Sequence, residues 1–267
     1  MQRIVVMDFE YGALTDVGRQ RANNEDAVLV DAVHGVVVLA DGMGGYNAGE
    51  VASGMAVNLI GGEMARWLRE AALIASTQDV RRAMEICVDN ANRAIFEASH
   101  AQAACAGMGT TLVMAVAHDN KLIIGHVGDS RAYRWRAGLL EQLTHDHSLL
   151  QEQIDIGLIT PEEAAASGNR NLVTRALGVE DAVLLDIRET DVVPGDQLLL
   201  CSDGLNDMLS DADIAAVLGA SVSADAKCRR LVNLANERGG RDNISVIIAR
   251  ASEAPQKSGV VAKLLGK

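Results

Sequence analysis

The stretch that decides the fold is Val36-Val37-Val38-Leu39-Ala40-Asp41-Gly42. Its unbroken run of aliphatic residues predicts a buried strand, and this strand ends in an aspartate beside a glycine. Two later parts of the chain repeat the arrangement, namely Leu122–Val127 before Gly128-Asp129-Ser130 and Leu198–Cys201 before Ser202-Asp203-Gly204. Each of the three predicts a strand that brings one carboxylate to its end.

Acidic residues also stand just ahead of two apolar runs. Glu25-Asp26 precedes Ala27–Val30, and Asp242 precedes Ile244–Ile248. Strands that converge at one end would gather these negative charges in a small volume, which is tolerable only if cations neutralise them. Carboxylates and carbonyls with no histidine or thiolate nearby select Mg²⁺, Mn²⁺ or Ca²⁺ over zinc. The sequence therefore predicts a site for hard divalent metal ions.

Length and composition favour one domain. The chain has 267 residues, and its hydrophobic content of 49% is ample for a single sizeable core. It has only 3 prolines, and no stretch rich in serine, glycine or one sign of charge marks a linker. We expect a single domain over residues 1–251, followed by a flexible C-terminal tail over residues 252–267.

The charge and the amino terminus argue against several functional classes. The 24 basic and 36 acidic residues give a formal net charge of −12, which disfavours binding to nucleic acid. Asp8 comes too soon for a signal-peptide core, and no apolar run approaches the roughly 20 residues of a membrane span. The 4 scattered cysteines are interpreted as small buried hydrophobic residues. These features predict a cytoplasmic protein without membrane insertion.

Helical periodicity predicts two long helices after the first strands. The first covers residues 47–76, and Gly61-Gly62 in its middle is a candidate break. The second covers residues 79–105, with Asp79 as its N-cap and Gly107 as its stop.

Strand patterns then return. Four short strands between residues 110 and 143 predict an antiparallel meander, and the polar segment that follows contains a helix start at Thr160-Pro161. Two strands, two helices and a last strand are expected at 183–189, 197–202, 211–218, 224–237 and 243–250. Strands come in runs and helices in pairs, so the class is α+β. The expected architecture is a four-layer αββα sandwich of two stacked, mainly antiparallel sheets flanked by helix pairs.

Six motifs in a fixed order carry a resemblance to a known family. They are Arg21-Ala22-Asn23-Asn24-Glu25-Asp26, Asp41-Gly42-Met43-Gly44-Gly45, Gly109-Thr110-Thr111, Val127-Gly128-Asp129-Ser130-Arg131, Ser202-Asp203-Gly204-Leu205 and Arg241-Asp242-Asn243. Over roughly residues 10 to 250 the chain resembles the metal-dependent serine/threonine protein phosphatases of the protein phosphatase 2C (PPM) type. The compact length and Met43 are similar to the bacterial branch.

The resemblance implies a binuclear Mg²⁺ or Mn²⁺ centre. By position, Asp41 would bridge both ions, and Asp203 and Asp242 would bind the first of them. Glu25 and the main-chain carbonyl of Gly42 would bind the second. Two such ions, roughly 3.5–4 Å apart, can convert a bridging water to hydroxide for in-line attack on a phosphoryl group.

The resemblance also assigns residues around this centre. Asp26 would hold metal-bound waters, and a third, weaker metal site would lie at Asp129 and Asp203. Arg21, four residues before Glu25, would bind the substrate phosphate with its planar guanidinium. Animal relatives carry a histidine where this chain has Met43, so the general acid must differ here, and a metal-bound water is the preferred substitute.

Several motifs have simpler structural interpretations. Any single Asp-Gly pair is more often a turn than a metal ligand, and only the ordered set favours binding. Gly109-Thr110-Thr111 is interpreted as a tight strand start under the site, and Arg131 as an ion-pair partner. The His145-Asp146-His147-Ser148 run is interpreted as a loop into the flap, at about residues 145–171, where relatives contact substrate.

The leading hypothesis is a protein phosphatase that hydrolyses phosphoserine and phosphothreonine with Mn²⁺ or Mg²⁺. Its partners would be phosphorylated proteins, and it would oppose a bacterial serine/threonine kinase. One alternative is a non-catalytic phosphoprotein-binding module, which should lack at least one metal-binding carboxylate, whereas all of them are present here. A second alternative is a phosphatase that acts chiefly on small phosphate esters.

Overall fold

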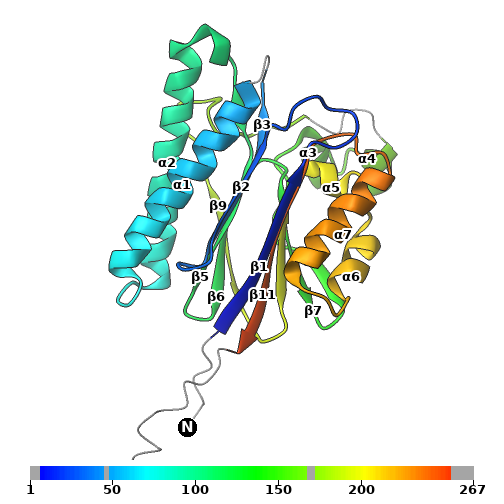
Figure 1. Ribbon diagram of the computed structural model, residues 1–267. Helices are drawn as coiled ribbons and strands as arrows, with labels where there is room; N and C mark the ends of the chain where they lie inside the picture. Colours follow the sequence, from blue (N-terminus) through cyan, green and yellow to red (C-terminus); the bar gives the residue numbers. More distant parts are fainter. Residues whose placement is uncertain (1–6, 45–47, 167–171, 254–267) are drawn as a thin grey trace, which may run out of the picture.

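Two antiparallel β-sheets stack face to face between two groups of helices (Figure 1). The structure is a computed structural model, and it describes residues 7–44, 48–166 and 172–253. The layers follow the order helices, sheet, sheet, helices. The predicted α+β class and the four-layer αββα sandwich are therefore confirmed.

Every strand pair in the two sheets is antiparallel. The first sheet has the order β1 (Met7–Asp16), β11 (Ile244–Glu253), β10 (Gln197–Cys201), β7 (Arg131–Arg136) and β8 (Leu139–Gln142). The second has the order β2 (Asp26–Asp31), β3 (Val36–Met43), β5 (Leu112–His118), β6 (Lys121–Val127) and β9 (Asp186–Asp191), with β4 (Gly109–Thr110) paired to β3.

Helices cover the outer face of each sheet. On the second sheet lie α1 (Ala48–Ala71) and α2 (Thr77–Ala101), which a short 3₁₀ turn, η1 (Ala103–Cys105), follows. On the first sheet lie α5 (Asp203–Asn206), α6 (Asp211–Leu218) and α7 (Ala224–Glu237). Between β8 and β9 the chain forms α3 (Leu149–Asp155) and α4 (Pro161–Ala166).

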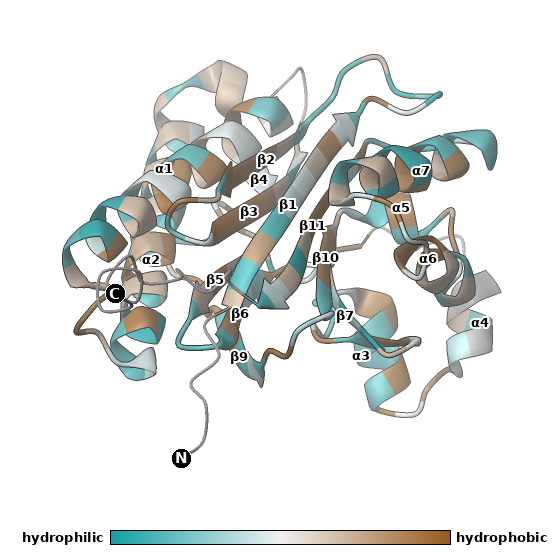
Figure 2. Ribbon diagram, turned by 60° about the horizontal axis from the view of Figure 1, so that its bottom comes forward, coloured by the Kyte–Doolittle hydropathy of each residue, from teal (hydrophilic) through white to brown (hydrophobic). Residues whose placement is uncertain are grey.

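The aliphatic runs are continuous because their strands are buried on both faces. In β3, Val36 and Val38 pack toward α1 and α2, while Val37 and Leu39 pack between the sheets. Figure 2 shows β3 as a mostly hydrophobic strand. A strand covered on both sides has no need of polar alternation, and the same holds for β10.

Helix α1 continues through Gly61-Gly62, so the candidate break is wrong. A Cβ atom at Gly61 would lie 2.8 Å from the Leu29 side chain in β2. The glycine therefore lets the helix lie close to the sheet, and this packing outweighs the low helix propensity of glycine.

Helix α2 has a different cap from the one expected. Ser76 is its N-cap, and Asp79 is the third helical residue, whose carboxylate accepts a hydrogen bond from the Ser76 N–H at 2.8 Å. This reciprocal arrangement is a capping box. The helix ends at Ala101 rather than at Cys105.

The four strands expected as one meander divide between the two sheets. Strands β5 and β6 pair in the second sheet, whereas β7 and β8 pair in the first. The chain crosses between them at Gly128, whose φ of +102° favours glycine. The crossing places Asp129 at the junction of the sheets, which a single meander would not do.

Other sequence expectations meet the structure near the flap and the C-terminus. The helix start at Thr160-Pro161 is confirmed, because Thr160 and Glu163 exchange capping hydrogen bonds. Strand β11 reaches Glu253, two residues beyond the expected domain end, and the rest of the expected tail lies outside the described residues. Among the described residues, no helix has both the length and the apolar character needed to cross a membrane.

Candidate metal centre

The predicted site residues meet at one end of the sandwich. The strand ends of β3, β6 and β10 and the starts of β2 and β11 gather there, at the upper end in Figure 1. A cleft of about 200 Å³ lies between them. Its lining includes Arg21, Glu25, Asp41, Gly42, Asp129, Asp203 and Asp242. Residues that the sequence separates by up to 221 positions therefore face one small volume.

Asp26 and Asp41 lie side by side on neighbouring strands. They are register partners in the β2–β3 ladder. Asp26 is only 9% exposed, and its carboxylate accepts a hydrogen bond from Ser202 Oγ at 2.8 Å. It thus lies behind the cleft, joined to the start of α5 rather than open to solvent.

The two threonines under the site fix the Asp41 main chain. The Thr111 hydroxyl accepts a hydrogen bond from the Asp41 N–H at 3.0 Å, and the Thr110 hydroxyl donates to the Asp41 carbonyl at 2.9 Å. The structural interpretation of this motif is therefore confirmed. Arg131 likewise forms the expected ion pair, with Asp146 at 2.7 Å.

The ionised carboxylates of the cleft repel one another strongly. Burial, followed by repulsion from Asp26, Asp203 and Asp129, raises the pKa of Asp41 well above its ordinary value. Burial, followed by repulsion from Asp129 and Asp242, does the same to the pKa of Asp203. Burial likewise raises the pKa of Asp26 and that of Asp129 to about 6. A bound cation is the partner that would make the ionised forms favourable.

The donor atoms fit a hard divalent cation. Oδ1 of Asp26 and Oδ1 of Asp203 are buried without a hydrogen-bond partner among the described residues. A buried carboxylate oxygen left in this way is costly unless it meets a cation or water. The cleft lining includes Glu25 and four aspartates but no cysteine or histidine, and such oxygen donors are the ligands that Mg²⁺ and Mn²⁺ prefer.

The Gly42 position requires glycine because the main chain is crowded there. Its N–H donates to the Glu25 carbonyl at 3.1 Å, and a Cβ atom would lie 2.1 Å from the Gly49 carbonyl oxygen. Glycine thus brings the end of β3, the start of β2 and the start of α1 together. Glu25 and Gly42 both line the cleft.

Arg21 lies at the rim of the cleft. Its Nη2 donates to Asp242 Oδ2 at 2.6 Å, and half of its side chain is exposed. The arginine therefore lies close to the acidic residues, as expected. Met43 also lines the cleft, and its thioether has no proton to donate.

Asn243 is a positioning residue to which the sequence analysis assigned no role. Its Oδ1 accepts from the Glu25 N–H at 2.8 Å, and its Nδ2 donates to the carbonyls of Val17 and Asn23. It is 5% exposed, so it ties the β1–β2 loop to the start of β11. The residue lies inside a quoted motif, but its partners are more than two hundred positions away and leave no local signal.

Asn243→Ala is expected to lower the free energy of unfolding by about 2–3 kcal/mol, because buried main-chain groups lose their partners. Urea unfolding measures the change. Asn58→Ala is the matched control, because Asn58 is exposed on α1 and its side chain donates to the Gly54 carbonyl of the same helix. We expect that control to change stability by less than about 0.5 kcal/mol. Equal effects of the two substitutions would contradict the positioning role.

Two stacked antiparallel sheets with a carboxylate cleft at their ends define a metal-dependent hydrolase. The family model described as "Protein phosphatase 2C" matches residues 17–245, and the chain belongs to this family. It is a metal-dependent protein serine/threonine phosphatase of the bacterial type.

Bacterial relatives match almost the whole chain. It is 38% identical to "Protein phosphatase PhpP" of Streptococcus pneumoniae over 247 residues, which cover 91% of this chain and 98% of that protein. It is also 38% identical to "Serine/threonine phosphatase stp" of Listeria innocua over 240 residues, with 88% and 92% covered.

Solved structures agree with the fold. The serine/threonine phosphatase PstP/Ppp of Mycobacterium tuberculosis matches with a TM-score of 0.83 and 37% identity, covering 92% of this chain and 99% of that one. A PstP catalytic domain in complex with two manganese ions matches with a TM-score of 0.81 and 35% identity, covering 93% and 100%.

Proposed function

We propose that this phosphatase removes phosphate from phosphoserine and phosphothreonine in proteins and opposes a serine/threonine kinase of the same cell. Two Mn²⁺ or Mg²⁺ ions would be held by Glu25, Asp41, Asp203, Asp242 and the Gly42 carbonyl. A third, weaker ion would bind at Asp129 and Asp203. The observation that carries the proposal is the convergence of these oxygen donors in one cleft, together with their mutual repulsion.

When bound by these residues, the ions would supply an activated water and neutralise charge on the phosphoryl group. The chain's own residues do the rest. Asp26, fixed by Ser202, holds and orients water at the base of the cleft. Arg21 lies at the rim, where its planar guanidinium can bind two phosphate oxygens. Because Met43 cannot donate a proton, water in the cleft protonates the leaving serine or threonine oxygen.

The proposed activity predicts that a phosphothreonine peptide is hydrolysed with Mn²⁺ and is not hydrolysed after chelation. The assay compares kcat/KM for the peptide with kcat/KM for a small aryl phosphate. We expect the peptide to be preferred, because a protein phosphatase gains transition-state binding from groups beyond the phosphate.

Three outcomes would contradict this function. Equal rates with and without Mn²⁺ would exclude the metal-dependent mechanism. Preference for the aryl phosphate would favour a phosphatase of small esters. Tight binding of the phosphopeptide without turnover in Mn²⁺ would favour a phosphoprotein-binding module.

A further inference from the structure

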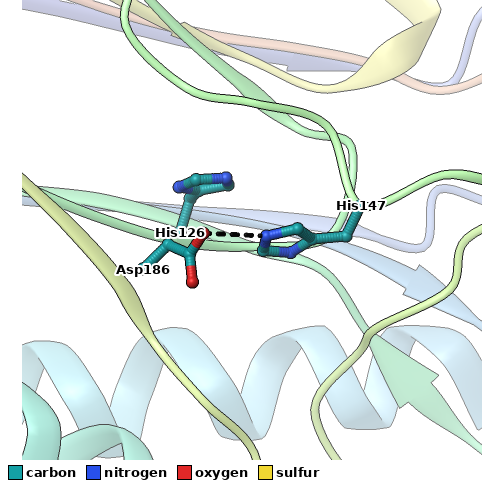
Figure 3. A group of neighbouring side chains, drawn as sticks. All are labelled: His126, His147 and Asp186. Atoms are coloured by element: carbon teal, nitrogen blue, oxygen red, sulfur yellow. Dashed lines mark hydrogen bonds and ion pairs between the residues drawn. The ribbon is translucent and has the colours of Figure 1, made fainter. Parts of the chain in front are cut away.

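A cluster of two histidines, an aspartate and an arginine lies beside the metal centre but outside its cleft. His126 lies on β6 and Asp186 opposite it on β9, while His147 follows β8 (Figure 3). The two imidazole rings stack at a centroid distance of 4.7 Å. His147 Nε2 is 3.2 Å from Asp186 Oδ2, and Arg175 Nη1 donates to Asp186 Oδ1 at 2.9 Å.

The spacing of His126, His147 and Asp186 is compatible with a metal ion, but their hydrogen bonds are not. The Gly128 N–H donates to His147 Nδ1 at 3.0 Å, so this nitrogen carries no proton and the neutral ring carries its proton at Nε2. That proton points to the carboxylate of Asp186. The cationic Arg175 also lies 3.1 Å from Nε2, where an ion would have to bind. The cluster therefore does not serve as a metal site.

His147 instead forms hydrogen bonds with Gly128, the residue that precedes Asp129 of the metal centre. Its ring accepts from the Gly128 N–H, and its own N–H donates to the Gly128 carbonyl at 3.0 Å. Gly128 is the residue before Asp129 and makes the crossing between the sheets. The N–H and the carbonyl of Gly128 are thus both held by His147, the first by its side chain and the second by its main chain.

The same residue joins the start of the flap to the segment just after it. The His147 carbonyl accepts from the Thr174 N–H at 2.9 Å, and its ring contacts Arg175. Burial lowers the pKa of His147; the hydrogen bond with Asp186 opposes this, but the stacked His126 ring and the Arg175 guanidinium lower the pKa as well, and the net direction is downward. The ring therefore stays neutral, as an acceptor at Nδ1 must. His147 is only 8% exposed, so solvent does not compete for these bonds.

We propose that His147 is a positioning residue, which acts through the Gly128 peptide to aim the Asp129 carboxylate at the metal centre. This inference rests on the proposed function, because it assumes that Asp129 binds a metal ion. Mutation of a residue that orients a metal ligand from outside the coordination sphere typically weakens metal affinity by about 10- to 100-fold. The flap is connected to Asp129 through the same residue, because Thr174 and Arg175 also contact His147.

Two substitutions separate the two ring nitrogens. His147→Asn keeps an acceptor near the position of Nδ1 and loses the contact with Asp186. His147→Gln places its amide near Nε2 and loses the acceptor for the Gly128 N–H. We expect His147→Gln to weaken the weakest class of Mn²⁺ sites by about tenfold or more, and His147→Asn to change its affinity by less than about threefold.

Calorimetric titration with Mn²⁺ measures these affinities, and Asp129→Asn gives the value for loss of the ligand itself. Long-range ¹H–¹⁵N spectra of the imidazole should show a neutral ring protonated at Nε2. His100→Gln is the matched control, because His100 is exposed at the end of α2. It should bind Mn²⁺ as the wild type does.

Equal Mn²⁺ affinities for His147→Asn and His147→Gln would overturn the inference, as would a ring protonated at Nδ1. If Asp129→Asn weakens Mn²⁺ binding but His147→Gln does not, the inference fails and the metal centre stands. If the wild-type protein takes up no Mn²⁺, the proposed function fails instead.

Discussion

Asp41→Asn is expected to lower kcat/KM for a phosphothreonine peptide by about a thousandfold while it stabilises the metal-free protein. Metal ions bound at this site would supply several kcal/mol of transition-state stabilisation, and about 4 kcal/mol corresponds to this loss in rate. Without metal, the Asp41 carboxylate is buried among four other aspartates that repel it. An uncharged amide removes this repulsion, so the free energy of unfolding in EDTA should rise by about 1–2 kcal/mol.

Asp196→Asn is the matched control, because Asp196 is another buried aspartate but lies at the opposite end of β10. Its carboxylate accepts two hydrogen bonds from Arg136 and one from the Val193 N–H. The same chemical change should therefore destabilise the protein by about 1–3 kcal/mol and leave kcat/KM unchanged. If Asp41→Asn also destabilised the metal-free protein, Asp41 would be a structural residue rather than a strained ligand.

The convergence of the aspartates could be predicted because its signal is local. A run such as Val36–Ala40 is aliphatic without interruption since both faces of β3 are buried, and Asp41 ends the run at the edge of the sandwich. The same reasoning holds for β10 and Asp203. Each aliphatic run predicts where its own strand ends. Because the same pattern recurs in several strands, it also predicts that these strand ends lie close together.

The features that could not be predicted depend on partners distant in sequence. Strands β6 and β7 follow each other in sequence with only Gly128-Asp129-Ser130 between them, and nothing local reveals that they lie in different sheets. The continuity of α1 through Gly61 depends on Leu29 in another element. Asn243 and His147 were missed for the same reason, because their roles consist of bonds to main-chain groups of other segments.

The metal-free protein should lose stability as the pH rises through about 6, and Mn²⁺ should reverse this dependence. Burial raises the pKa of Asp26 and that of Asp129 to about 6, above the ordinary value of 3.8. The folded protein thus keeps these protons to higher pH than the unfolded chain does. Their stabilisation is complete below about pH 4 and is lost as the pH rises through about 6. Each group contributes on the order of 2–3 kcal/mol.

Two buried histidines act in the opposite direction over part of this range, so the comparison must isolate the aspartates. Burial lowers the pKa of His126 and that of His147, and such groups add stability as the pH rises toward the ordinary value of 6.5. Asp129→Asn keeps both histidines, and the difference between wild type and this variant reports the Asp129 charge together with its repulsion of Asp41 and Asp203. Urea unfolding in EDTA between about pH 4 and pH 7 should show the wild type falling relative to Asp129→Asn.

Saturating Mn²⁺ should reverse the sign of the pH dependence of stability. Cations bind the deprotonated carboxylates, so binding strengthens as the protons leave. The free energy of unfolding of the wild type should then rise over the same pH range, by more than that of Asp129→Asn. A wild-type profile in EDTA that is parallel to that of Asp129→Asn would mean that the Asp129 carboxylate ionises freely in the fold. In that case the electrostatic argument for a cation at this position would fail, since the protein would tolerate the charge without one.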